Sequence, residues 1–168
     1  MSFLIWLEGT GFGTFVRESP SILGYPTFIV LHTLGLSIVV GTSTVVAARV
    51  LGFANSIPLQ SMERLFLVIW IGFAVNGFSG SGLALATASG QFTNPIFLAK
   101  LFFVFMAVGC LRLLQVKIFR DPILADRGDI PSDKVLTSKL LAGSMLGLWL
   151  FAMITGRLIA YAGVIVGR

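Results

Sequence analysis

The chain has 168 residues, of which 56% are hydrophobic and only 11% are charged, and its mean hydropathy is +0.95. This composition excludes a soluble domain, and its hydrophobicity, without proline repeats, excludes disordered and collagen-like chains. In a membrane protein a net charge of +5 bears first on topology, so we do not take it as evidence for a nucleic-acid partner. The single cysteine, Cys110, excludes an intrachain disulfide and a cysteine-based metal cluster. We therefore expect an integral membrane protein.

The N-terminal segment 1–21 is expected to be neither a signal peptide nor a membrane span. No basic residue precedes its short apolar run at 3–7, as a signal peptide would require. Glu8 and later charged residues interrupt the rest of the segment, so it is not apolar enough to span the membrane. Such a segment suits a short helix lying in the headgroup region of the membrane. Pro26 then marks the start of the first span, because proline fits the first turn of a helix.

Four stretches of the chain are long and apolar enough to cross a membrane. A hydrocarbon core of about 30 Å requires about 20 residues of helix, which places the spans at about 25–48, 65–87, 95–114 and 140–166. No stretch alternates with a period of two, as the strands of an outer-membrane barrel would. The predicted fold is an all-α, integral membrane four-helix bundle, with residues 1–168 in a single transmembrane domain.

The basic residues predict the orientation of the bundle. Eight of the twelve flank the first and third connections between spans, and these are Arg49, Arg64, Arg112, Lys117, Arg120, Arg127, Lys134 and Lys139. By the positive-inside rule the 115–139 loop is cytoplasmic, and both termini face outward, to the periplasm of a bacterial inner membrane. We expect this loop of mixed charge to be a solvated connector, with a docking surface for a partner as the alternative.

Three ionisable side chains fall inside the predicted spans: His32, Lys100 and Arg157. Placing each such side chain in the membrane costs about 2.5–3.5 kcal/mol of insertion free energy. At about 1.5 Å of rise per residue they lie roughly 10, 8 and 12 Å from the outer ends of three different helices, with Asn76 somewhat deeper on the second span. The predicted spans contain no Asp or Glu. This shared depth predicts a cationic cavity near the outer face that binds an anionic group.

An imidazole and two cations in one apolar cavity match the needs of a haem with two propionates. We expect His32 to be the axial ligand to iron, Lys100 and Arg157 to pair with the propionates, and Asn76 to donate a supporting hydrogen bond. One histidine excludes bis-histidine ligation within a chain. The iron would then be five-coordinate, or it would take a sixth ligand from Lys100 as a neutral amine, Met106, Met153 or a residue of a neighbouring subunit. A quinone headgroup could use the same donors.

Each of these features also has a structural interpretation. Lysine and arginine at this depth could extend to the outer interface, and a lone histidine could form an interhelical hydrogen bond. Small residues at a spacing of four allow close helix packing or an oligomer contact, and they are Gly143 and Gly147, and Ala152, Gly156 and Ala160. The alternative function is therefore a non-catalytic membrane scaffold or assembly subunit, and a second alternative is a small carrier or channel for an anion or copper.

Two motifs resemble known families. The run YPTFIVLHTLGL at Tyr25–Leu36 and the segment NPIFLAKL at Asn94–Leu101 resemble an uncharacterised family of small bacterial four-helix membrane proteins. At greater distance, a first-span histidine and a third-span lysine are similar to HemJ-type protoporphyrinogen oxidases and to CopD-type copper-resistance membrane proteins. The HemJ-type resemblance implies haem b bound through His32, with Lys100 functionally important, and the CopD-type resemblance implies copper uptake.

Taken together, these patterns favour a membrane b-type haemoprotein that transfers electrons, with a quinone or a tetrapyrrole as its substrate. If it is an enzyme, it is a membrane oxidoreductase; a hydrolase is disfavoured because no pair of carboxylates lies within the spans. We also expect a homo-oligomer, because four helices of this length make a small bundle.

Overall fold

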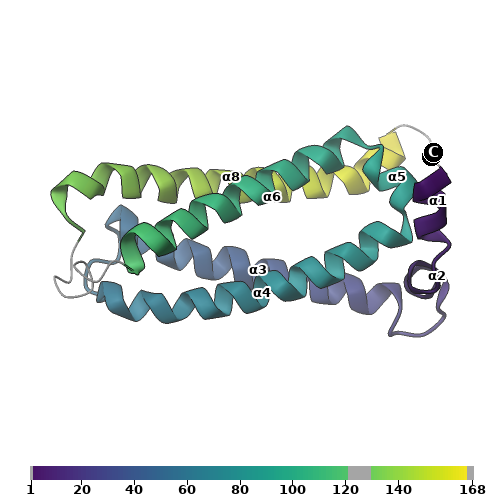
Figure 1. Ribbon diagram of the computed structural model, residues 1–168, viewed down its shortest axis with the longest axis horizontal. Coiled ribbons are helices and arrows are strands. Elements are labelled where there is room, and N and C mark those ends of the chain that lie inside the picture. The colour runs from purple at the N-terminus through teal and green to yellow at the C-terminus, as the bar shows by residue number, and fades with distance from the viewer. Residues whose placement is uncertain (1, 121–129, 166–168) are drawn as a thin grey trace.

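The computed structural model describes residues 2–120 and 130–165, with backbone alone at residues 160 and 162–165. Across the described residues the chain is helical and has no strand (Figure 1). The helices are α1 (Ser2–Glu8), α2 (Gly11–Glu18), α3 (Tyr25–Leu51), α4 (Leu59–Ala86), α5 (Ala88–Phe92), α6 (Pro95–Leu114), the π-helix η1 (Gln115–Phe119) and α8 (Ser132–Ile165).

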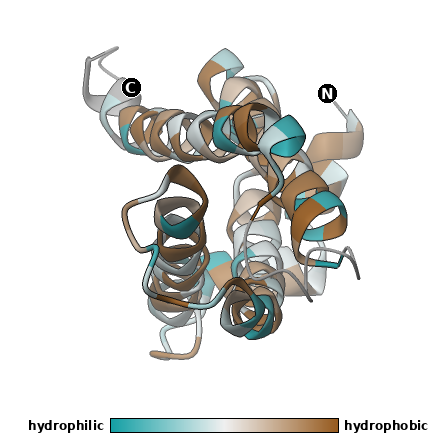
Figure 2. Ribbon diagram, turned by 90° about the vertical axis from the view of Figure 1, so that its left-hand side faces the viewer, coloured by the Kyte–Doolittle hydropathy of each residue, from teal (hydrophilic) through white to brown (hydrophobic). Residues whose placement is uncertain are grey.

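Four of these helices are long and apolar enough to cross a membrane, namely α3, α4, α6 continued by η1, and α8. Hydrophobic residues occur all around them (Figure 2), which is typical of helices surrounded by lipid. Large apolar side chains such as Leu67 and Phe105 are about two-thirds exposed on the outer surface of the bundle. In water such a surface would be an aggregation hazard, whereas in a bilayer it contacts acyl chains. The predicted membrane bundle is confirmed.

The four long helices form two pairs. α3 packs along α4, α6 packs along α8, and α3 also packs against α8. The main core includes Phe66, Leu111 and Trp149, from three of the four helices. α4 meets the end of the third span at η1, where the rings of Phe66 and Phe119 lie 5.0 Å apart between centroids. Contact at this end leaves the opposite halves of α4 and α6 as the walls of a cavity, described below.

Close packing of α3 on α4 depends on glycine. A Cβ atom at Gly35 would lie 2.7 Å from the backbone nitrogen of Asn76 and 2.9 Å from the carbonyl oxygen of Gly72. Both neighbours belong to the α4 backbone, which cannot move aside as a flexible side chain could. The two helices therefore approach more closely than any larger residue at position 35 would allow.

The short helices α1 and α2 lie across the end of the bundle at which α5 connects α4 to α6 (Figure 1). The Glu8 carboxylate accepts hydrogen bonds from both the backbone N–H and the hydroxyl of Ser89, each at 2.7 Å. The Arg17 guanidinium donates to the carbonyl oxygen of Ala86 at 3.1 Å. On α1, Phe3 and Trp6 are exposed and stacked, as expected for a helix in the headgroup region.

The structure corrects several predicted boundaries. Two short helices replace the single one expected in segment 1–21, because the Thr10 hydroxyl accepts from the N–H of Gly13 and caps a second helix. The connection after the second span contains α5. The second and fourth membrane-spanning helices begin earlier than predicted, at Leu59 and Ser132, because polar residues extend both helices beyond their apolar segments. Residues 121–129 of the predicted loop, and position 166 at the end of the last span, lie outside the described residues.

Candidate functional site

A cavity of about 420 Å³ lies between α3, α4 and α6. Its polar lining includes His32 from α3, Asn76 from α4 and Lys100 from α6, and its apolar lining includes four phenylalanines, at positions 73, 92, 97 and 105. This volume falls within the range of about 300–1,000 Å³ that small-molecule sites occupy. The structure therefore brings together His32, Lys100 and Asn76, three of the four side chains that the sequence selected.

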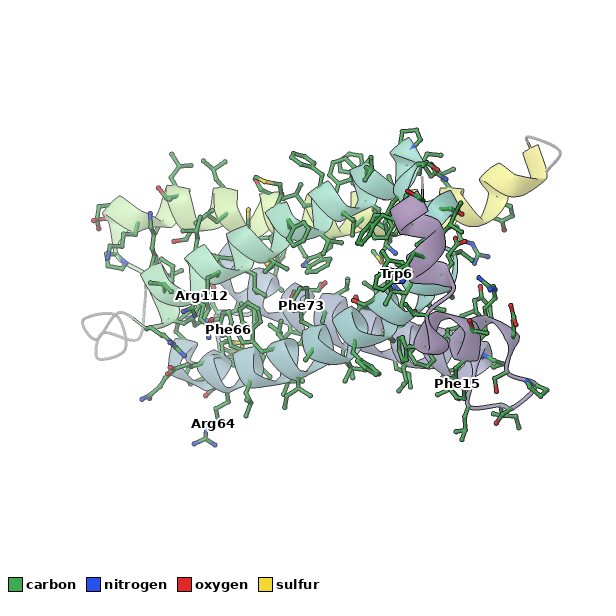
Figure 3. The ribbon with its side chains drawn as sticks, turned by 45° about the vertical axis from the view of Figure 1, so that its right-hand side comes forward. Trp6, Phe15, Arg64, Phe66, Phe73 and Arg112 are labelled. Atoms are coloured by element: carbon green, nitrogen blue, oxygen red, sulfur yellow. The ribbon has the colours of Figure 1, made fainter. Side chains whose placement is uncertain are left out.

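The cavity opens sideways, between α4 and α6. Four of its lining residues are exposed on the outer surface of the bundle, and they are Gly77, Ser81, Phe92 and Phe105. Phe73 projects toward the space between α4 and α6, farther along the bundle than Phe66 and Arg112 (Figure 3). Because the surrounding surface is apolar, a ligand would reach this opening from the lipid.

A polar contact joins α4 to η1 on the side of the cavity nearer η1. The indole N–H of Trp70 donates to the side-chain oxygen of Gln115 at 3.1 Å, and Arg112 donates to the same oxygen at 2.8 Å. Gln115 is almost fully buried, so these bonds satisfy an acceptor that water does not reach. The Trp70 ring also packs edge-on against Phe73, which lines the cavity above it.

The His32 imidazole is held against the backbone of α4. Its Nδ1 atom lies 3.1 Å from the carbonyl oxygen of Asn76, and the Asn76 amide donates to the carbonyl oxygen of His32 at 2.8 Å. A carbonyl oxygen only accepts hydrogen bonds, so this shorter contact is satisfied when Nδ1 carries the proton; in the other tautomer Nδ1 would accept from the Asn76 amide, whose nitrogen lies 3.3 Å away. With the proton on Nδ1, Nε2 keeps its lone pair, and it makes no hydrogen bond to any residue that the structure describes.

A glycine makes room for this imidazole. A Cβ atom at Gly80 would lie 2.8 Å from Cε1 and 3.0 Å from Nδ1 of His32, so no other residue fits there with the ring in place. Sequence reasoning did not connect Gly80 with His32. Gly80 follows Asn76 by four residues, and residues four apart share one helix face. This spacing could have indicated that Gly80 lies beside the same partner as Asn76.

The start of α6 places Lys100 at the level of the cavity. The Asn94 side chain accepts from the N–H of Ile96 at 2.9 Å, and Pro95 occupies the first turn, so this dipeptide fixes where the helix begins. The half-buried Lys100 side chain runs past α8, where a Cβ atom at Gly156 would lie 3.6–3.8 Å from its last three atoms. Lys100 forms no hydrogen bond or ion pair with another described residue.

Arg157 does not join this group. It is exposed, and it is not among the described residues that line the cavity. Its guanidinium lies 5.4 Å from the centroid of the Tyr161 ring on the same helix and donates to the Tyr161 hydroxyl at 3.4 Å. The reason is helical geometry: Gly156 faces Lys100, and the next residue is turned by about 100° around the helix axis.

Among the predicted sixth ligands within the chain, Lys100 alone lines the cavity in the described structure. Met106 and Met153 are exposed on the outer surface of the bundle. The described residues also contain no group of three His, Cys, Asp or Glu side chains placed to hold a metal ion. A single imidazole is better suited to a metal that already has ligands of its own, as haem iron has from its macrocycle.

Comparisons with protein-family models, with curated proteins and with solved structures found no match to this chain. The resemblances carried by Tyr25–Leu36 and Asn94–Leu101 stay predictions.

Proposed function

We propose that this chain binds a b-type haem in the lateral cavity, with His32 as the axial ligand, and that it transfers electrons within the membrane. The observation that carries the proposal is the state of the imidazole, whose Nδ1 is engaged by the Asn76 carbonyl while Nε2 has no described partner. Metal-binding histidines commonly donate their second ring N–H to a carbonyl or carboxylate, which fixes the tautomer and the ring orientation.

The cavity lining fits a flat, amphipathic macrocycle. Because Gly77 and Gly80 have no side chains, the surface of α4 beside His32 is flat, and the phenylalanines of the lining supply aromatic contacts. Lys100 offers a cation without a described counter-ion, which suits a propionate. The lateral opening lets the ring extend beyond the enclosed volume. Haem would supply one-electron chemistry, and the chain would bind it, orient it and keep water away.

A quinone is the second candidate ligand. The opening between α4 and α6 faces the outer surface of an apolar bundle, which favours a lipid-soluble molecule. His32 and Lys100 could bind quinone oxygens as well as haem propionates. In the haemoprotein, we propose that a quinone exchanges electrons with the haem. If the purified protein is colourless, a quinone becomes the principal ligand of the cavity.

A non-catalytic assembly role is supported by a different surface. On α8, Gly143 and Gly147 lie one turn apart, and a Cβ atom at either position would meet nothing within 4 Å. This strip is open to another helix, so we propose that copies of the chain associate through it. Gly147→Leu should then shift the protein toward the monomer on analytical ultracentrifugation in detergent, and an unchanged oligomer would exclude this contact.

We also propose that the end of the bundle carrying η1 and the start of α8 faces the cytoplasm, since most basic residues gather there. The haem cavity then lies nearer the periplasmic face.

The visible spectrum tests the function. Purified in mild detergent after expression with ample haem, the protein should show a Soret band that shifts on addition of dithionite. His32→Ala should lose this band. Arg157→Gln is the matched control, because it removes an intramembrane cation that lies outside the cavity, and its spectrum should match the wild type. A colourless wild-type protein, or an unchanged spectrum in His32→Ala, would overturn the proposal.

A further inference from the structure

A second cavity, with basic walls, lies at the opposite end of the bundle from α5. It has a volume of about 530 Å³ and lies between η1 and the first turns of α8. Lys117, Arg120 and Lys134 line it together with apolar side chains that include Val116 and Leu141. Its described lining contains no carboxylate. We call this site the basic groove.

The basic groove lies at the level of the lipid headgroups. Lys117 follows Pro95 by 22 residues, or about 33 Å of helix, and this exceeds a hydrocarbon core of about 30 Å. Lys100 lies 17 residues before Lys117, or about 25 Å away along the same axis. The groove is therefore separate from the cavity that contains His32.

Apolar surface continues from the groove toward the membrane interior. Val116 lines the groove and is exposed, and the exposed side chains of Leu113 and Leu140 follow in the direction of the bilayer centre. A molecule with an anionic head and long acyl chains would contact both parts of this surface. A soluble anion would contact the basic part alone.

We propose that the basic groove binds the headgroup of an anionic phospholipid. Lys117 and Arg120, which both line the groove, contact its phosphate. Basic pockets between transmembrane helices are suited to such headgroups because charge attraction acts where acyl chains are already held by the bilayer. This binding is independent of the haem proposal, since the two sites share no residue.

Native mass spectrometry of the detergent-purified protein tests the proposal, with phosphatidylglycerol and phosphatidylcholine of identical acyl chains as probes. The wild type should retain phosphatidylglycerol in preference to phosphatidylcholine. The double variant Lys117→Gln, Arg120→Gln should lose roughly thirtyfold in affinity for phosphatidylglycerol, because each basic group near the headgroups contributes about fivefold. The control Arg64→Gln, Lys139→Gln removes the same charge outside the groove and should keep the preference.

Three outcomes would overturn the proposal. They are equal retention of the two lipids by the wild type, equal loss in the double variant and its control, and displacement of the lipid by inorganic phosphate at matched concentration, which would indicate a site for a free anion. If the double variant does not fold, the single variants Lys117→Gln and Arg120→Gln serve instead, each with a loss of roughly fivefold.

Discussion

The chemistry of the lateral cavity depends on how one imidazole is held. Asn76 contacts His32 through both its backbone carbonyl and its side-chain amide, and Gly80 leaves room for the ring. The ring is thus positioned by α4, although His32 itself belongs to α3. Such support from a neighbouring helix fixes the direction of Nε2, which a freely rotating histidine would not maintain.

Gly80→Ala should disturb the site without removing the imidazole. The added methyl group would lie 2.8 Å from His32 Cε1, so the ring must turn away from the Asn76 carbonyl. We expect a shifted Soret band and haem affinity at least tenfold lower, measured by haem titration of the apoprotein. Gly109→Ala on α6 is the control, because a Cβ there meets nothing within 4 Å and Gly109 is not among the described residues that line the cavity. Equal effects of the two substitutions would contradict this account of His32.

Sequence reasoning located His32, Asn76 and Lys100 because depth along a helix follows directly from residue number. It misplaced Arg157 because rotation about the helix axis does not follow in the same way. Spans that are apolar all around carry no strong polar face to indicate which side meets the other helices. The Asn76 carbonyl was also beyond prediction, since sequence identifies side chains and not the backbone groups that they contact.

At the scale of helices, backbone contact between α3 and α4 sets the geometry around the cavity. Gly35 of α3 contacts α4 at Asn76, the residue whose carbonyl holds His32. The contact that packs the two helices and the hydrogen bond that holds the imidazole therefore both involve Asn76. The spans themselves were predictable from apolar length, but their ends were not, because polar turns continue α4 and α8 and a threonine cap divides the N-terminal segment.

Gly35→Ala should destabilise the bundle. Its methyl group would overlap the α4 backbone, and overpacking of this kind costs about 1–3 kcal/mol. We expect a lower Tm in detergent, followed by circular dichroism. Gly41→Ala on the same helix is the control, because its Cβ meets no neighbour and alanine favours the helix, so its Tm should be equal or higher. A Tm for Gly35→Ala at or above the wild-type value would refute the close contact.

The attachment of α1 to α5 should depend on pH. Hydrogen bonds from the Ser89 hydroxyl and backbone N–H lower the pKa of Glu8 below its ordinary value of 4.5. A lowered folded-state pKa means that this attachment is complete above pH 4.5 and is lost as the pH falls through the lower, folded value. Amide hydrogen exchange, corrected for intrinsic rates, should show equal protection of α1 at pH 7 and pH 5, and reduced protection near pH 3.

The matching variants separate Glu8 from other carboxylates. Glu8→Gln should remove the change in protection between pH 5 and pH 3. Glu18→Gln should preserve that change, because Glu18 is exposed and pairs with the neighbouring Arg17. Persistence of the full change in Glu8→Gln would assign it to another group.

At the scale of the whole molecule, the bundle has two chemically different ends. The short helices α1, α2 and α5 lie at the end nearer His32 and Lys100, and the basic groove lies at the other (Figure 1). The sequence predicted this polarity from the positions of the basic residues. It did not predict the lateral opening, which depends on how far α4 and α6 separate after they meet at η1.

Cysteine labelling tests the proposed orientation. In a Cys110→Ala background, Ser2→Cys should react with a membrane-impermeant maleimide on intact cells, and Ser132→Cys should react only after lysis. Both serines are exposed and lie at opposite ends of the bundle, so accessibility reports the side of the membrane. Labelling of Ser132→Cys on intact cells would reverse the orientation.

The most direct measurement of the central claim uses the fact that the chain contains one histidine. Protein produced with ¹⁵N-labelled histidine is purified in the ferric state, and the nitrogen hyperfine couplings of its haem iron are measured by electron nuclear double resonance. We predict that one axial nitrogen coupling changes from the ¹⁴N to the ¹⁵N pattern, because His32 Nε2 binds the iron. A haem spectrum with no coupling altered by the label would contradict the assignment of His32.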